Sequence, residues 1–135
     1  LGLDVGKKTI GLSLADPQTR VASPKPVLWR KKFTTDAKLL VEQIDKLNVG
    51  GLVIGWPLNM DGTIGPRCDS IRDFAHAFLR LHEIPISFQD ERLSTQAVER
   101  GMVAADMTRA KRAVRRDSLA AVWILQSALD TYDHQ

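Results

Sequence analysis

LGLDVGKKTIG, residues 1–11, predicts a strand, a tight turn at residues 6–8 and the start of a returning strand over residues 9–15. Alternation along the first strand places its leucines and its valine on one face and Asp4 on the other. Aspartate is uncommon in strands and costly to bury, so Asp4 needs a partner. Two interpretations stay open. Asp4 caps the turn or pairs with a lysine or arginine, or it binds a ligand where Gly2 and Gly6 let another group come close.

The chain has 135 residues, which predicts one domain over residues 1–135 with a core of its own. Its hydrophobic content of 44% and charged content of 26% are ordinary for a soluble globular protein. The one cysteine, Cys68, excludes an internal disulfide, and no cluster of zinc ligands surrounds it in the sequence. No apolar run is long enough to span a bilayer and no signal peptide is visible, so we expect a cytoplasmic location and no membrane association. The net charge of +3 is compatible with a nucleic-acid partner without requiring one.

Beyond the hairpin, apolar strand segments alternate with helical periodicity. This order predicts an α/β domain with a mixed sheet that is parallel in its later strands. Prolines should confine the third strand to a sheet edge, and Thr34 or Thr35 should cap the first helix. The second helix should begin at Pro66 and bury a stripe that includes Leu79. The expected elements are strands at 21–29, 52–54 and 84–88, and helices at about 35–47, 66–79, 94–105 and 116–132.

Three acidic residues lie at the ends of expected core elements. Asp4 is in the first strand, Glu91 follows a strand that we expect to be parallel, and Asp117 begins the last helix. Each has a structural alternative, because Glu91 can pair with Arg92 on the surface and an aspartate in a first helical turn favours the helix dipole. Together, three carboxylates suggest a site for Mg²⁺ or Mn²⁺. Two such ions can activate a water and stabilise the leaving oxygen of a phosphodiester.

Cationic residues adjoin these acids and suggest contacts with a polyanion. The alternative is an ordinary solvated surface. The loop at 56–65 could approach a nucleic-acid backbone through Asn59, or be merely rich in turns. The three tryptophans could stack on bases, although we expect core packing for at least two of them. The candidate nucleic-acid contacts are Lys7, Lys8, Asn59, Arg92, Arg109, Lys111, Arg112, Arg115 and Arg116.

Four segments resemble the YqgF (RuvX) family, in order along nearly the whole chain. The first is Leu3-Asp4-Val5-Gly6 with Gly11, and the longest runs from Val53 to Gly62 and is followed by Gly65-Pro66. The third is the stretch DERLST at 90–95, and the last is Asp117 with the helix that follows it. Trp56 and Cys68 depart from residues that are common in the family, and neither is one of the acids.

The resemblance implies an RNase H-like (RuvC-type) fold, with a mixed five-stranded sheet and helices on both faces. It implies a bacterial or bacterial-derived nuclease associated with the 5′ end of precursor 16S ribosomal RNA. Carried over to this sequence, the family's catalytic and metal-binding acids fall on Asp4, Glu91 and Asp117. The expected activity is therefore two-metal hydrolysis of phosphodiester bonds, with structured RNA as the substrate.

Other functions fit parts of the same pattern. A Holliday junction-resolving endonuclease would use the same chemistry on branched DNA, and a symmetric pair of subunits would be expected. A non-catalytic nucleic-acid or ribosome-assembly module would keep the acids for structure. The pattern of Asp4, Gly6 and Gly11 also resembles the phosphate loop of actin-like ATPases, but those need two such domains. The sequence leaves the oligomeric state and the choice between RNA and DNA open.

Overall fold

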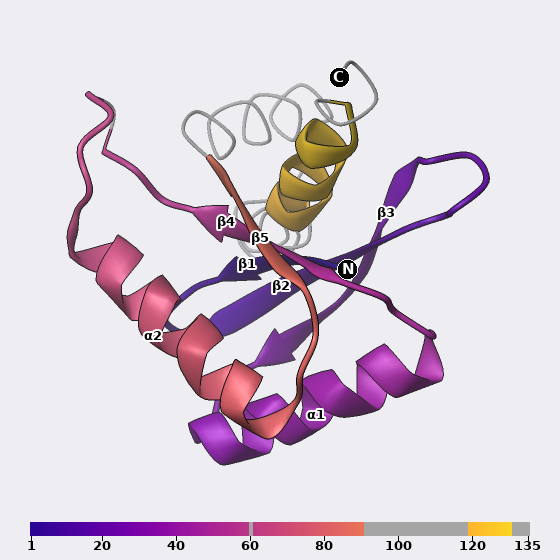
Figure 1. The fold of residues 1–135 in the computed structure, drawn as a ribbon, viewed down its shortest axis with the longest axis horizontal. Helices are drawn as coiled ribbons and strands as arrows, with labels where there is room; N and C mark the ends of the chain where they lie inside the picture. Colours follow the sequence, from indigo (N-terminus) through magenta and orange to yellow (C-terminus); the bar gives the residue numbers. More distant parts are fainter. Residues whose placement is uncertain (60, 91–118, 131–135) are drawn as a thin grey trace, which may run out of the picture.

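A mixed five-stranded sheet forms the centre of the protein (Figure 1). The computed structural model describes residues 1–59, 61–90 and 119–130. In spatial order the strands run β3-β2-β1-β4-β5, with β1 antiparallel to β2 and β2 antiparallel to β3. Strand β4 is parallel to both β1 and β5, which confirms the mixed sheet with parallel later strands. The strands are β1 (Gly2–Val5), β2 (Thr9–Ala15), β3 (Ala22–Trp29), β4 (Leu52–Trp56) and β5 (Ile86–Asp90).

The opening hairpin forms as its sequence predicts. The Gly6 N–H donates to the Thr9 carbonyl at 2.9 Å and closes the turn between β1 and β2. The register pairs Gly2 with Ser13 and Asp4 with Gly11. Successive side chains point to opposite faces of a strand, so Gly2 and Asp4 share one face of the sheet, and Leu3 and Val5 share the other.

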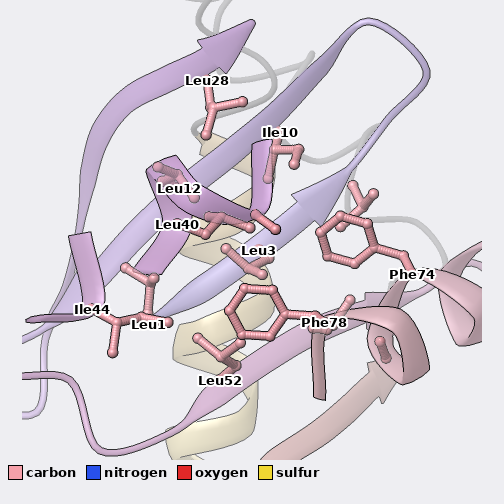
Figure 2. Packing of buried hydrophobic residues seen from close by; sticks show 14 of the residues in the cluster. Leu1, Leu3, Ile10, Leu12, Leu28, Leu40, Ile44, Leu52, Phe74 and Phe78 are labelled. Atoms are coloured by element: carbon pink, nitrogen blue, oxygen red, sulfur yellow. The ribbon is translucent and has the colours of Figure 1, made fainter. Parts of the chain in front are cut away.

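Two helices cover the face that carries Leu3 and Val5: α1 (Phe33–Lys46) and α2 (Pro66–Leu81). Leu3 and Ile54, neighbours on adjacent parallel strands, are fully buried at the centre of this layer. Burying side chains of this size gives roughly 1.5–3 kcal/mol each, so this layer is the main source of stability. Figure 2 shows α1 and α2 contributing to it, together with the strands. The helical members are Ala37, Leu40 and Ile44 from α1, and Ile71, Phe74, Ala75 and Phe78 from α2.

The opposite face of the sheet is covered by residues 119–130, here called the C-terminal helix (Figure 1). The Ser13 hydroxyl donates to the Ala121 carbonyl at 2.7 Å, and the Ala22 N–H donates to the Gln126 Oε1 at 2.9 Å. Ala121, Ile124 and Leu125 are buried. Helices therefore lie on both faces of the sheet, as the resemblance implies. No helix within the described ranges is long and apolar enough to cross a membrane.

The start of α1 differs from the prediction. Neither Thr34 nor Thr35 caps the helix, because it begins at Phe33 with Lys32 at the capping position and no side-chain cap there. Instead, the Asp36 carboxylate reaches back and accepts the Lys31 N–H at 2.9 Å. Asp36 lies in the first turn of the helix, and its side chain is fully buried.

Two predictions of burial are also wrong. Leu79 is 41% exposed, because at about 100° per residue it lies about 80° around the helix from Ile71, at the flank of the buried stripe. Trp29 and Trp123 are 59% and 43% exposed, so only Trp56 packs against the core. Strand β3 lies at the sheet edge, as its prolines predict. The helix expected at 94–105 and the ends of the last helix lie outside the described residues.

Candidate active site at the carboxyl edge of the sheet

Three parallel strands end at the same edge of the sheet. Strands β1, β4 and β5 run in one direction and finish at Val5, Trp56 and Asp90, and these three ends define the carboxyl edge. Trp56 is paired with Asp90, so β4 and β5 end level with each other. In open α/β sheets, binding sites are built outside such an edge. Asp4 lies one residue before the end of β1, which places it at this edge.

Asp4 is flanked by glycines on both neighbouring strands. On β2 its partner is Gly11. On β4, continuing the parallel register of Leu3 with Ile54 by one residue brings Gly55 beside Asp4. Neither neighbour has a side chain that could cover the half-buried Asp4 carboxylate. The two neighbouring strands therefore contribute backbone alone on either side of Asp4.

The C-terminal helix lies on the Asp4 face of the sheet. Gln126 contacts Ala22 beyond the amino end of β1, whereas Ala121 lies over Ser13, the partner of Gly2. The helix therefore runs opposite to β1: its later residues lie over the amino end of β1, and its earlier residues lie closer to the carboxyl end. The amino-terminal end of this helix points toward the edge where Asp4 lies.

Gly2 lets this helix approach closely. A Cβ added at Gly2 would clash with the Ser13 hydroxyl, and would lie 2.8 Å from the Leu125 Cβ and 2.9 Å from the Ala121 carbonyl oxygen. The latter is backbone, which cannot move aside as a flexible side chain can. The glycine before the aspartate thus sets the distance between the sheet and the C-terminal helix.

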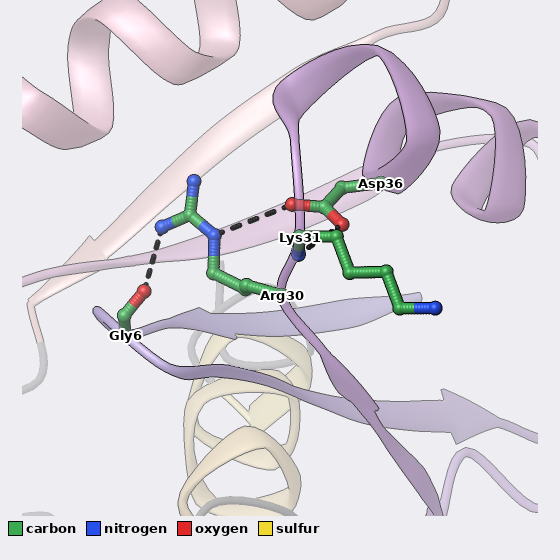
Figure 3. A network of polar contacts seen from close by, with 4 residues as sticks. All are labelled: Gly6, Arg30, Lys31 and Asp36. Atoms are coloured by element: carbon green, nitrogen blue, oxygen red, sulfur yellow. Dashed lines mark hydrogen bonds and ion pairs between the residues drawn. The ribbon is translucent and has the colours of Figure 1, made fainter.

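A partly buried polar network fixes the turn that follows Asp4 (Figure 3). The Arg30 Nη1 donates to the Gly6 carbonyl at 2.6 Å, and its Nε lies 3.6 Å from the Asp36 Oδ2. The backbone N–H of Arg30 also donates to the Lys8 carbonyl at 2.8 Å. This bond extends the pairing of β2 with β3 by one step. Arg30 therefore connects the start of α1 to the turn. No spacing rule in the sequence signals the pairing of Arg30 with Asp36.

The structure describes three of the candidate nucleic-acid contacts, Lys7, Lys8 and Asn59. Lys7 and Lys8 are exposed at the tip of the β1–β2 turn, beside the carboxyl edge. Asn59 is exposed, but its Nδ2 donates to the Thr63 hydroxyl at 2.9 Å, so it helps to hold its own loop. The remaining predicted contacts and two of the acids lie outside the described residues: Glu91, Arg92, Arg109, Lys111, Arg112, Arg115, Arg116 and Asp117.

The described part of the site supplies an oxygen donor of the type that Mg²⁺ and Mn²⁺ bind. Among residues 1–59, 61–90 and 119–130, no three His, Cys, Asp or Glu side chains are grouped so that they could hold a metal ion. A multi-acid centre at Asp4 would therefore need carboxylates from other parts of the chain. The glycines beside Asp4 are compatible with such a centre because they add no side chains next to its carboxylate.

Residues 1–131 match the family model described as "RuvX: Holliday junction resolvase". The chain belongs to the RuvX family. The match includes the strand that carries Asp4, the carboxyl edge and the C-terminal helix.

Relatives named "Putative pre-16S rRNA nuclease" are similar over almost the whole chain. The protein of Paramagnetospirillum magneticum is 52% identical over 130 residues, covering 96% of this chain and 84% of the relative. That of Phenylobacterium zucineum is 54% identical over 132 residues, covering 96% and 85%. The Brucella ovis protein is 51% identical over 129 residues, covering 96% and 80%.

The fold is also that of a solved resolvase. The crystal structure of the fowlpox virus Holliday junction resolvase aligns with a TM-score of 0.50 over 97% of this chain and 96% of the viral chain. The sequences are only 11% identical, so this likeness concerns the fold alone. The RNase H-like, resolvase-type fold expected of a RuvX protein is thereby confirmed.

Proposed function

We propose that this chain is a metal-dependent nuclease that acts on structured RNA and processes the 5′ end of precursor 16S rRNA. The observation that carries the proposal is the position of Asp4, flanked by glycines at the carboxyl edge of a resolvase-type sheet. Membership in RuvX and the names of relatives that are more than 50% identical supply the substrate class. A single domain over residues 1–135 and a cytoplasmic site of action belong to the same proposal.

In this proposal Asp4, Glu91 and Asp117 hold Mg²⁺ or Mn²⁺. The bound ions would supply an activated water and charge stabilisation for the leaving oxygen of the phosphodiester. The aspartate acts from the end of a strand whose turn is anchored by Arg30, so its backbone is fixed before substrate arrives.

Cations around the acids would hold the RNA backbone. Lys7 and Lys8 extend from the turn that follows Asp4 and can reach phosphates near the cleaved bond. Arg92 and the run of Arg109, Lys111, Arg112, Arg115 and Arg116 are proposed to do the same from other segments. Asn59 is proposed to contact the backbone while it holds its loop.

The direct test compares wild type with Asp4→Asn on two substrates, an RNA spanning the 5′ end of precursor 16S rRNA and a four-way DNA junction. Each is incubated in Mg²⁺, in Mn²⁺ and in EDTA. We expect metal-dependent cleavage of the RNA, and a loss of at least about 100-fold in Asp4→Asn, since changes in outer-shell groups alone cost 10–100-fold. Circular dichroism of the variant checks that the fold is kept.

The family description favours one alternative, cleavage of DNA junctions. Cutting of the DNA junction without the RNA would replace our proposal with that activity. Binding of the RNA without cleavage in any metal would instead identify a non-catalytic ribosome-assembly module.

A further inference from the structure

A cavity of about 400 Å³ opens beside the carboxyl edge, on the face of the sheet opposite Asp4. It lies between the β1–β2 turn and α2, and Val5 and Gly6, the two residues after Asp4, form part of its wall. Consecutive Cα atoms are about 3.8 Å apart. The backbone of the cavity wall therefore begins about 4 Å from that of the candidate catalytic acid, Asp4. Its size is within the usual range for ligand-binding sites.

Three cations line this cavity, from three separate segments of the chain: Lys7 from the turn, Arg30 after β3 and Arg67 at the start of α2. One acid, Asp73, also lines it. Lys7 and Arg67 are exposed, so both side chains are accessible to a ligand from solvent. The charge of the cavity wall is therefore predominantly positive.

Arg30 is held in place before any ligand binds. Its Nη1 donates to the Gly6 carbonyl, its Nε lies near the Asp36 carboxylate, and its guanidinium lies over the Phe74 ring at 5.7 Å from the centroid. Asp36 offsets part of its charge, but the second terminal nitrogen points away from both partners in Figure 3. A guanidinium fixed in this way loses little side-chain entropy when an anion binds.

Part of the cavity wall is apolar. This part includes Phe33, Ile71 and Phe74, and the two aromatic rings meet edge to face with centroids 5.5 Å apart. A cleft lined by cations and by low-dielectric groups concentrates the electrostatic potential and strengthens the attraction of an anion.

We propose that this cavity is a subsite for a phosphate of the RNA strand flanking the cleaved bond, bound by Lys7, Arg30 and Arg67. The inference rests on the proposed function, since it takes the ligand to be the nuclease's own substrate. A strand that passes over the carboxyl edge would meet the acids on one face of the sheet and this cavity on the other. The subsite would position the strand and leave the chemistry to Asp4.

The test measures RNA binding in EDTA, where the proposed chemistry is off, with the 5′ precursor 16S segment as the probe. The variants are Arg67→Ala, which removes a cation, and Asp73→Asn, which removes the acid. Arg80→Ala is the matched control, an exposed arginine near the other end of the same helix and not part of this cavity. Thermal melts confirm that each variant is folded.

We expect Arg67→Ala to weaken binding about 2- to 5-fold, the range for losing one phosphate contact that is open to solvent. The slope of log affinity against log salt should become shallower by about 0.7. Asp73→Asn should strengthen binding, and Arg80→Ala should leave it unchanged. In Mg²⁺, Arg67→Ala should raise KM with little change in kcat.

The outcomes separate this subsite from the proposed function. If wild type binds the RNA but Arg67→Ala and Asp73→Asn match Arg80→Ala, the subsite is wrong and the nuclease proposal stands. Equal weakening by Arg67→Ala and Arg80→Ala also overturns it, since the effect would then be one of overall charge. If wild type neither binds nor cleaves the RNA, the nuclease proposal fails and the subsite fails with it.

Discussion

Asp36 shows how one residue can fix the geometry next to a site without touching it. Its Oδ1 accepts the Lys31 N–H, and its Oδ2 lies 3.6 Å from the Arg30 Nε. That second distance is too long for a hydrogen bond, and Oδ2 has no hydrogen-bond partner among the described residues. The carboxylate thus stays buried mainly through one hydrogen bond and the charge of Arg30. Through Arg30 it supports the turn that follows Asp4.

We therefore expect Asp36→Ala to lower the free energy of unfolding by about 1.5–3 kcal/mol, the usual worth of a hydrogen bond to a charged group. The loss follows because the Lys31 N–H would be left without its acceptor and the Arg30 guanidinium without its neighbouring negative charge. Urea denaturation measures it. Asp45→Ala is the control, an exposed aspartate on the same helix that should change stability by less than about 0.5 kcal/mol. Equal effects of the two substitutions would contradict this role for Asp36.

At the scale of elements, the C-terminal helix packs closely on the sheet because Gly2, which lies under it, has no side chain. Gly2 leaves room for Leu125 and for the backbone of Ala121, and the Ser13 hydroxyl bonds to that same carbonyl. In our proposal the segment before this helix brings Asp117 toward Asp4. The separation of helix and sheet would then control the distance between two metal ligands.

Gly2→Ala should destabilise the protein by about 1–3 kcal/mol, as overpacking does in a well-packed interior. It should also reduce nuclease activity, because the helix must shift away from β1. Gly50→Ala is a matched control, since a Cβ at Gly50 meets nothing within 4 Å. Melting temperatures and cleavage rates of both variants, measured side by side, test this. A Gly2→Ala protein as stable and active as Gly50→Ala would show that the helix does not depend on this close contact.

At the scale of the whole molecule, the sequence predicts the architecture because local patterns agree with it. The alternation in residues 1–15, the glycines around β4 and Pro66 at the start of α2 each specify an element that the structure contains. The cap of α1 could not be predicted in this way. The structure shows no side-chain cap there, and the Asp36 carboxylate instead accepts the Lys31 N–H ahead of the helix, beside the Arg30 guanidinium.

The candidate site is predictable to a smaller extent. Asp4 could be singled out because an aspartate between glycines is unusual in an apolar strand, and its place at the carboxyl edge follows from strand order. The role of the triad with Glu91 and Asp117 remains a prediction from the resemblance. The cavity at Lys7, Arg30 and Arg67 could not be foreseen, since its cations come from segments that are distant in sequence and meet only in the fold.

The central claim is that Asp4 is a metal ligand at a nuclease site rather than a residue that the fold requires. Thermal melts of wild type and Asp4→Asn, each in EDTA and in Mg²⁺, test it most directly. Asparagine keeps the size of aspartate, and removing one of several crowded carboxylates relieves repulsion. We therefore predict that Asp4→Asn melts at the wild-type temperature or slightly above it in EDTA. Mg²⁺ should raise the melting temperature of wild type, because it binds only the folded state, and should raise that of the variant much less.

Asp45→Asn, an exposed change away from the carboxyl edge, should behave as wild type in both conditions. A structural Asp4 predicts the opposite sign, since breaking a buried ion pair costs roughly 3–5 kcal/mol. If Asp4→Asn melts far below wild type in EDTA and wild type gains nothing from Mg²⁺, the account of Asp4 as a metal ligand is contradicted.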